Sequence, residues 1–451
     1  MSASRELARW ALGLQLADVP AAVRRTACRH VLDALGCGLG ASRFGQAGPA
    51  RHVAMQLGGP PEATVIGGGR APAPNAALAN GTLIHALDFD DTHAESLVHV
   101  TVAVLPAALA VAEECGATGA DLLTAVIAGI EAVTRLGGAV RHGFHARGFH
   151  ATSVCGTFAS ALAAGRLYGL DEDATVCALG IAGSFAAGSL EFLADGSTTK
   201  QLHPGWAAHS GVLAARLAGA GQSGPETIFE GASGLFRSYL GQAVEAGRLT
   251  HGLGDRWETA RITIKPYPAC QLSHASLDAL QTMKVQASEV RAIRFRLPEE
   301  AAEIVCRPEA AKRSPRTPYD AKFSLPWCAA ALLVDGGLGT ESFELGRIQR
   351  PEVLELAARV VYETYDPGVA AADAPGRAEV TLRDGATRVG EVASSRGGPD
   401  HPLSEEQLLE KFRLNAGPGH EALAQKTLGL ESLPSVVDLA ALIAGRAEVA
   451  R

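Results

Sequence analysis

The sequence predicts a mainly α-helical protein with an α+β second domain. Three observations predict it. Apolar residues recur at helical spacing through roughly the first 260 residues, alternating strand patterns appear only after residue 264, and helical spacing returns after residue 402. A chain of 451 residues has the length of two or three domains. We therefore expect a large all-helical domain of residues 1–264, completed by residues 403–451, and an inserted, smaller α+β domain of residues 265–402.

The N-terminal part is a succession of expected helices. Pro20 suits a first helical turn, and Val23, Ala27, Val31 and Leu35 then follow at helical spacing. Short turns that contain glycine or aspartate separate the later helices. These are expected at about 75–88, 101–114, 119–136, 151–168, 172–193 and 206–218. The exception is "ATVIGG", which suits a small strand or an extended connection.

Residues 265–402 combine strands and helices. In "VRAIRFRL", Ile293, Phe295 and Leu297 alternate with arginines, which is typical of a half-buried strand. Asp384 and Gly385 form a turn signal between two alternating runs, and this predicts a hairpin. Helices are expected at about 273–284, 319–335 and 351–362. The segment "SEEQ" then has capping-box spacing and predicts the return to helix. A cleft between two such domains would be a natural active site.

Composition excludes several classes of protein. The net charge of −8 argues against nucleic-acid binding, which needs a basic face. An anionic substrate must then be attracted by local cations. The apolar stretch 176–193 is mostly alanine and glycine and contains Glu191, so we expect a buried helix pair and no membrane span. The eight cysteines are scattered, without a C-x-x-C pair, and no signal peptide opens the chain; a cytoplasmic protein is expected.

The segment "HALDFDDTH" concentrates ionisable groups between two largely apolar, alanine-rich segments. Three interpretations compete: a metal site, an acid/base site, or a solvated polar loop between helices. If the preceding helix continues, His85 and Asp88 share one face, and Thr92 and His99 follow within reach. The spacing matches no defined metal pattern such as H-E-x-x-H. The acids at 90 and 91 suit an ordinary solvated loop equally well.

A second cluster surrounds His150, which directly precedes a helix of small apolar residues. The dipole at a helix N-terminus favours the neutral form of a histidine, and a neutral imidazole suits a general base. The alternative is a structural histidine whose ring binds a backbone carbonyl. Cys155, in the same segment, is expected to be a buried structural thiol and not a nucleophile.

Two lysines complete the set of candidates. Lys200 precedes a predicted helix, with His203 and Trp206 close by in sequence. Lys265 stands at the predicted domain junction, where prolines flank Tyr267 and stiffen the backbone. Solvated lysines are the alternative. Lysines that neutralise carboxylates, together with histidines and an aspartate that move protons, suit a polycarboxylate that loses a proton α to a carboxylate.

Nothing in the sequence indicates a nucleotide. "GCGLGA" lacks the third glycine of the dinucleotide fingerprint and follows no strand, and there is no P-loop and no G-x-S-x-G. Two interpretations of a different class stay open: a metal-dependent hydrolase built on the 85–99 cluster, and a non-catalytic helical dimer.

Six motifs occur in one order: "NGTLIHALDFDDTH", "RGFHATSVCGTFASALAAGRLYGL", "KQLHPGWAAHSG", "IKPYPACQLSHASLDAL", "AKFSLPWCAAALLVDG" and "GGPDHPLSEEQLLEKF". On these motifs the chain resembles the MmgE/PrpD family, which includes 2-methylcitrate dehydratases, cis-aconitate decarboxylases and iminodisuccinate epimerases. The resemblance implies that the α+β domain of residues 265–402 is a lid domain and that the protein is a homodimer. It also implies chemistry on small polycarboxylates without cofactor or metal. The active-site positions that it implies are Asp88, Thr92, His99, His150, Lys200 and Lys265.

Two positions depart from the pattern of the decarboxylases. Cys270 replaces a histidine five residues after the lid lysine, the next histidine being His274, and Trp327 replaces a tyrosine. We expect these three residues, with Thr92 and the two lysines, to contact substrate. The departures disfavour decarboxylation, so the expected activity is that of a 2-methylcitrate dehydratase-like hydro-lyase. The alternatives are an iminodisuccinate epimerase-like isomerase and a cis-aconitate decarboxylase-like carboxy-lyase.

Overall fold

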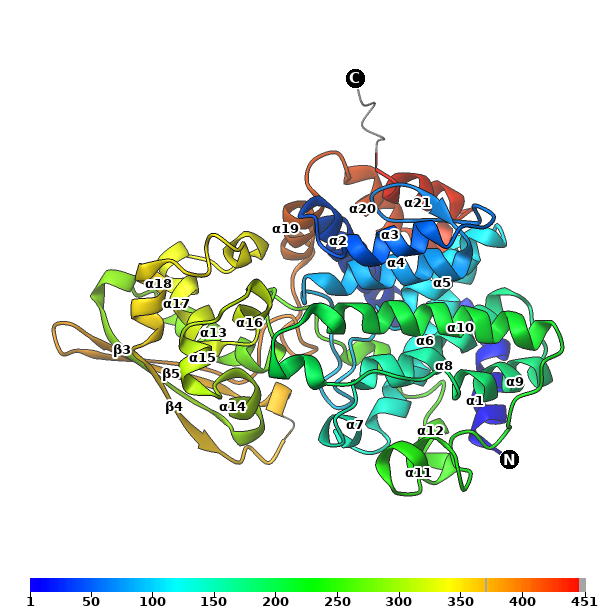
Figure 1. The fold of residues 1–451 in the computed structure, drawn as a ribbon, viewed down its shortest axis with the longest axis horizontal. Helices are drawn as coiled ribbons and strands as arrows, with labels where there is room; N and C mark the ends of the chain where they lie inside the picture. The colour runs from blue at the N-terminus through cyan, green and yellow to red at the C-terminus, as the bar shows by residue number, and fades with distance from the viewer. Residues whose placement is uncertain (370, 446–451) are drawn as a thin grey trace. The chain divides into compact units, whose positions relative to one another are not determined.

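The structure is a computed structural model that describes residues 1–369 and 371–445 (Figure 1). The last six residues of the predicted segment 403–451 lie outside this description. The chain divides into two compact units. Unit 1 comprises Met1–Leu193, Thr198–Ile262 and the C-terminal part from Glu405, and unit 2 comprises Ala194–Ser197 and Thr263–Ser404.

Among the described residues of unit 1, the strands form one two-stranded ribbon, β1 (Ala63–Thr64) with β2 (Arg70–Ala71), and the other regular elements are helices. The ribbon includes the start of "ATVIGG". The helices of the N-terminal part are α1 (Ala3–Gly13), α2 (Ala21–Arg43), α3 (Gly48–Gln56), α4 (Ala73–Ala86), α5 (Leu105–Glu114), α6 (Gly119–Gly138), α7 (Gly143–Ala146), α8 (Ala151–Leu167), α9 (Glu172–Ala182), α10 (Leu202–Gly219), α11 (Leu235–Leu240) and α12 (Ala246–Thr250). The C-terminal part adds α19 (Glu405–Ala416), α20 (Glu421–Leu428) and α21 (Val437–Ile443).

Small residues let α10 approach α4 and α8 closely, and Figure 1 shows α10 running alongside α4. A Cβ atom on Gly81 of α4 would lie 2.6 Å from the Cα atom of Gly205 in α10. A Cβ atom on Gly211 would lie 2.4 Å from the Cβ atom of Ser160 in α8. Larger side chains would force these helices apart. The contacts bring the end of α4, the start of α8 and the start of α10 together.

One predicted helix of unit 1 is too long. The apolar segment 172–193 was expected to be helical throughout, but α9 ends at Ala182. Gly183 follows it, and a Cβ atom there would lie 2.3 Å from the Ile228 side chain. Turns then lead to a short 3-10 helix at Glu191–Ala194. The alanine and glycine content that predicted continued helix also permits this close packing of a turn. No helix among residues 1–369 and 371–445 combines the length and apolar character that crossing a bilayer requires.

Unit 2 contains a four-stranded sheet of order β4-β3-β5-β6. Its strands are β3 (Val290–Pro298), β4 (Val360–Tyr365), β5 (Gly376–Leu382) and β6 (Thr387–Val392). β3 pairs parallel with β4 and antiparallel with β5, and β5 and β6 form an antiparallel hairpin. Asp384 and Gly385 lie in its turn, where Gly385 has φ +91°. The predictions of the first strand and of the hairpin are confirmed.

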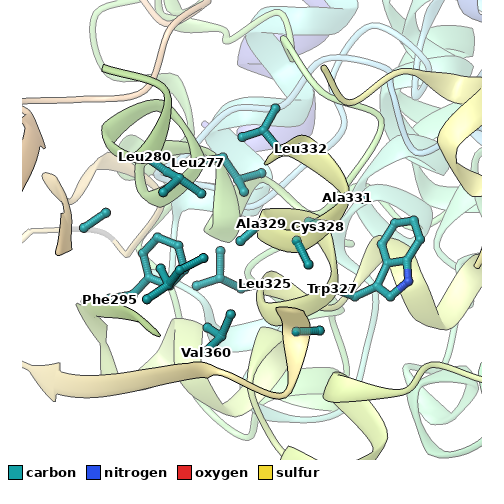
Figure 2. Packing of buried hydrophobic residues seen from close by; sticks show 14 of the residues in the cluster. Leu277, Leu280, Phe295, Leu325, Trp327, Cys328, Ala329, Ala331, Leu332 and Val360 are labelled. Carbon is teal, nitrogen blue, oxygen red and sulfur yellow. The ribbon is translucent and has the colours of Figure 1, made fainter. Parts of the chain in front are cut away.

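One face of the sheet packs on helices of the same unit. Ile293, Phe295 and Leu297 are buried and the arginines between them are exposed, as the alternating pattern predicted. The helices of this unit are α13 (His274–Thr282), α14 (Glu299–Val305), α15 (Glu309–Arg313), α16 (Pro318–Lys322), α17 (Leu325–Asp335) and α18 (Pro351–Ala357). Figure 2 shows part of the resulting core, with Trp327 of α17 at one side and Leu277, Leu280 and Phe295 at the other.

Two predicted helices of unit 2 differ from the structure. Residues 351–362 form α18 only as far as Ala357, and strand β4 begins at Val360, where β-branched residues favour an extended backbone. Residues 319–335 form two helices and not one. Ser324 caps α17, its hydroxyl accepting a hydrogen bond from the Trp327 N–H at 3.0 Å, and Pro326 occupies the first turn.

Candidate active site

The loop between α4 and α5 carries most of the candidate residues and is buried. Asp88 follows the end of α4 in a left-handed conformation with φ +51°, which aspartate tolerates better than most residues. Its N–H donates a hydrogen bond to the His85 carbonyl at 3.0 Å. Further along, the His99 N–H donates to the Thr152 hydroxyl of α8 at 3.0 Å. The loop is therefore held to both neighbouring helices.

Lys200 reaches this loop from the 3-10 helix Thr198–Gln201. Its Nζ atom lies 2.6 Å from Oδ1 of Asp88 and 3.5 Å from Nε2 of His99. Asp88 is fully buried and Lys200 is 5% exposed. The structure thus brings together three of the residues predicted for the site.

Asp90 lies between two histidines. Its Oδ2 atom is 2.8 Å from Nδ1 of His85 and 3.3 Å from Nδ1 of His99. Burial alone would raise the pKa of Asp90, but the two imidazoles hold it well below its ordinary value, so the carboxylate is ionised and can only accept hydrogen bonds.

The neighbours of His99 determine its tautomer. An ammonium group can only donate, so Nε2 of His99 faces Lys200 as the acceptor, and the ring hydrogen of the neutral form lies on Nδ1, toward Asp90. His99 therefore presents a lone pair to Lys200. This is the arrangement in which a carboxylate orients a histidine for proton transfer.

His150 is the N-cap residue of α8, as predicted, and is 2% exposed. Its Nδ1 atom lies 2.9 Å from Nδ1 of His203 on α10, so one ring donates the shared hydrogen and the other accepts it. Burial, and to a lesser extent Lys200 and His203, lower the pKa of His150 well below its ordinary value. Burial likewise lowers the pKa of His203 to about 4. Both rings are neutral at pH 7.

Three imidazoles of this site are placed such that they could hold a metal ion. One ring nitrogen from each of His85, His99 and His150 lies within 4.8 Å of the others. Their centroids are 4.4 Å apart for His85 and His99, 5.8 Å for His85 and His150, and 5.9 Å for His99 and His150.

The two acids for which a solvated loop stayed open are buried. Asp90 and Asp91 are each 1% exposed. Asp91 accepts hydrogen bonds from the N–H and hydroxyl of Thr101, at 3.0 and 2.5 Å, and lies 2.7 Å from Nδ1 of His30. Asp91 therefore fixes the conformation of the loop, whereas Asp90 belongs to the histidine cluster. Thr92 lies in the same buried loop, and its predicted contact with substrate stays a prediction.

The remaining candidates lie in unit 2. Lys265 is 1% exposed. Cys270 is partly exposed, and its N–H donates to the Lys322 carbonyl at 2.8 Å. His274 is fully buried, with Nε2 3.0 Å from the Ala269 carbonyl. This contact ties the ring to the backbone of its own unit, so His274 fits a structural role better than the predicted substrate contact.

Trp327 does not fit the predicted substrate-binding role. Its side chain is fully buried in the core of unit 2 (Figure 2). The indole N–H donates to the Ile348 carbonyl at 3.0 Å, and the ring packs against Phe343. A donor that is already bonded inside a core cannot bind a carboxylate. This prediction from the motif is therefore corrected.

Sequence reasoning missed other residues of the site. His85 was not among the predicted site residues, Asp90 was left open between a solvated loop and the site, and His203 was named only as a neighbour of Lys200. The spacing His85–Asp90, across the end of a helix, was the available signal, but only the turn at Asp88 brings the two together. Cys155 is buried, and burial raises its pKa far above the ordinary thiol value, as expected of a structural thiol.

Two family models match the chain. The MmgE/PrpD N-terminal domain covers residues 5–246, and the MmgE/PrpD C-terminal domain covers residues 267–431. The chain belongs to the MmgE/PrpD family. The resemblance inferred from the six motifs is thus confirmed over most of the sequence.

Several relatives within the MmgE/PrpD family are similar over nearly their whole length. The chain is 32% identical to a cis-aconitate decarboxylase of Homo sapiens, over 96% of this chain and 92% of the relative. It is 29% identical to a cis-aconitate decarboxylase of Aspergillus terreus, over 97% and 95%. It is 28% identical to the cis-aconitate decarboxylase-like protein oryM of Aspergillus oryzae, over 98% and 97%.

Proposed function

We propose that this protein is a lyase, and specifically a carboxy-lyase that acts on cis-aconitate or a closely related tricarboxylate. The observation that carries the proposal is the similarity, over more than nine-tenths of the chain, to relatives named cis-aconitate decarboxylases. This favours the alternative over the hydro-lyase expected from the sequence.

The burial of Trp327 removes one of the two arguments against decarboxylation. That argument required the indole to face substrate, and the side chain lies in a core instead. The second argument is the replacement of a histidine by Cys270, whose neutral thiol carries no charge. Lys312 interacts electrostatically with Cys270, so a cationic side chain already belongs to this region of unit 2.

The proposed chemistry uses the His99–Lys200 pair. The bond between a carboxylate carbon and the substrate skeleton breaks, CO2 leaves, and the bonding electrons stay on the skeleton. The Lys200 ammonium stabilises the developing negative charge, and the pair delivers the proton that forms the new C–H bond. A solvent proton restores the pair. Because Lys200 and His99 are 3.5 Å apart, the proton can pass between them.

One observation favours a second candidate, the 2-methylcitrate dehydratase-like hydro-lyase. His150 is held neutral by burial, and a neutral imidazole suits abstraction of a proton α to a carboxylate. Dehydration and epimerisation both begin with that step. Decarboxylation does not require it.

NMR of substrates in D2O distinguishes these reactions. With cis-aconitate we expect CO2 release, a shift of the double bond to the vacated carbon, and itaconate that carries one deuterium on its saturated CH2 carbon. Protonation of the allylic carbanion at the vacated carbon would give the methyl isomer instead. With 2-methylcitrate we expect no loss of water. Dehydration of 2-methylcitrate together with inert cis-aconitate would establish the second candidate instead. Chelator is expected to leave turnover unchanged, because the proposed steps need only side chains.

The homodimer and the cytoplasmic location implied by the resemblance and the cysteine usage stay proposals. Analytical ultracentrifugation tests the first, with a species of twice the 46.5 kDa chain mass expected. Fractionation of cells that produce the protein tests the second.

A further inference from the structure

The three clustered imidazoles are each held through Nδ1. Asp90 binds Nδ1 of His85 at 2.8 Å and approaches Nδ1 of His99 to 3.3 Å, and His203 binds Nδ1 of His150. Metal-binding histidines are commonly oriented in this way, by a partner on the ring nitrogen that does not bind the metal. In addition, His85 is fully buried, and its Nε2 atom has no hydrogen-bond partner among residues 1–369 and 371–445. A buried acceptor without a partner is costly in an enzyme site unless something binds it.

We propose that His85, His99 and His150 form a reversible binding site for a borderline divalent transition-metal ion such as Zn2+, and that the bound ion inhibits the enzyme. Inhibition rests on the proposed function, because the ion would occupy the imidazole that transfers the proton. Binding does not rest on it. The site is distinct from a cofactor site, since turnover needs the same nitrogen atoms free of metal.

The distances permit such a site with small movements. An ion equidistant from three nitrogens 4.8 Å apart lies about 2.8 Å from each of them, whereas Zn–N bonds are about 2.0–2.1 Å. Each ring must therefore move inward by at most about 0.7 Å. Three histidines leave the fourth tetrahedral position to water, as in other zinc sites with three protein ligands.

The charges at the cluster permit a cation but limit its affinity. Two carboxylates, Asp88 and Asp90, lie at the cluster together with the ammonium group of Lys200. The carboxylates attract a divalent ion, and the ammonium repels it. Lys200 competes with the ion for Nε2 of His99, so removing its charge is expected to strengthen metal binding.

The test is calorimetric titration of chelator-treated protein with Zn2+ in the absence of substrate. We expect one ion per chain in the wild type. Asp90→Asn should weaken binding about 10- to 100-fold, the usual cost of removing a partner that orients metal-binding histidines. His85→Gln should weaken it at least as much. Lys200→Met should strengthen it, a gain that misfolding cannot produce. His209→Gln, at a half-buried histidine on α10 that binds the Pro74 carbonyl, is the matched control and should bind as the wild type does.

Co2+ identifies the ligands independently. Nitrogen and oxygen ligands give weak visible bands, whereas thiolates add strong near-ultraviolet absorption, which would point to the free cysteines. The proposal is overturned if the wild type binds no Zn2+, if Asp90→Asn and His85→Gln bind it as tightly as the wild type, or if the cobalt spectrum is that of a thiolate site. Each of these outcomes is independent of whether the protein decarboxylates anything.

Discussion

Lys200 and Asp88 form a buried ion pair, with Nζ 2.6 Å from Oδ1 and side chains 6% and 1% exposed. Such a pair can affect both activity and stability, and a double-mutant cycle can separate the two effects. In the proposed reaction the lysine acts through its contact with His99, and the aspartate balances its charge. Losing either one alone leaves a charge buried without its partner.

Lys200→Met is expected to lower the free energy of unfolding by about 3–5 kcal/mol, because Asp88 loses its ion-pair partner. The double variant Asp88→Asn with Lys200→Met should regain most of this stability, since both charges are gone, yet stay inactive. Denaturant unfolding and turnover of the four proteins in this cycle provide the measurement. Activity in the stable double variant would remove Lys200 from the mechanism.

The neutral histidines predict how stability depends on pH. The folded pKa of His203 is about 4, below the ordinary 6.5, so between these values the unfolded state binds more protons and the free energy of unfolding rises with pH. The stability that neutral His203 contributes is fully present above pH 6.5 and is lost as the pH falls toward 4. It amounts to on the order of 3 kcal/mol. Between pH 7 and 4.5, the free energy of unfolding should fall less steeply with decreasing pH in His203→Asn than in the wild type. Equal slopes would show that His203 does not titrate in this way.

The predicted acid/base residues are tested by rate. Proton transfer by a positioned side chain contributes about 10²- to 10⁴-fold. His99→Gln should therefore lower kcat by at least about 100-fold with cis-aconitate, while circular dichroism stays unchanged. His150→Gln should do the same if the hydro-lyase chemistry operates, and less if decarboxylation does. A loss under threefold in His99→Gln would exclude it as the proton donor.

Local sequence patterns predicted the positions of most helices, of the first strand and of the hairpin, because helical spacing and strand alternation are decided by neighbours along the chain. They failed at Val360, where a predicted helix is a strand, since pairing with Ile293 is a long-range contact. The site shows the same division. His150 at a helix N-terminus is readable from sequence, whereas the contact of Asp90 with two histidines depends on a left-handed turn at Asp88 and on packing between α4, α8 and α10.

Trp327 illustrates how a motif position can mislead. Aligned with a tyrosine of the decarboxylases, it was expected to contact substrate, but the first turn of α17 directs it into a core. We expect Trp327→Phe to lower the free energy of unfolding by about 1–3 kcal/mol, because the Ile348 carbonyl loses its donor. The ratio of activities on cis-aconitate and 2-methylcitrate should not change. A changed ratio, measured on folded protein, would return Trp327 to the substrate pocket.

Lys265 is the candidate that most needs a functional measurement. It is 1% exposed and lies two residues from Tyr267, whose hydroxyl donates to Asp278 at 2.7 Å and so anchors this segment within unit 2. Burying a charged lysine costs free energy unless a partner balances the charge. The alternative of a solvated surface lysine therefore does not describe Lys265. If Lys265 binds a substrate carboxylate in both the ground state and the transition state, Lys265→Ala should raise KM as well as lower kcat. The matched control is Lys284→Ala, an exposed lysine of the same unit, for which neither constant should change. If Lys265→Ala has wild-type stability toward denaturant and keeps both constants, Lys265 has no role in catalysis. A higher KM with unchanged stability would identify it as a carboxylate-binding residue.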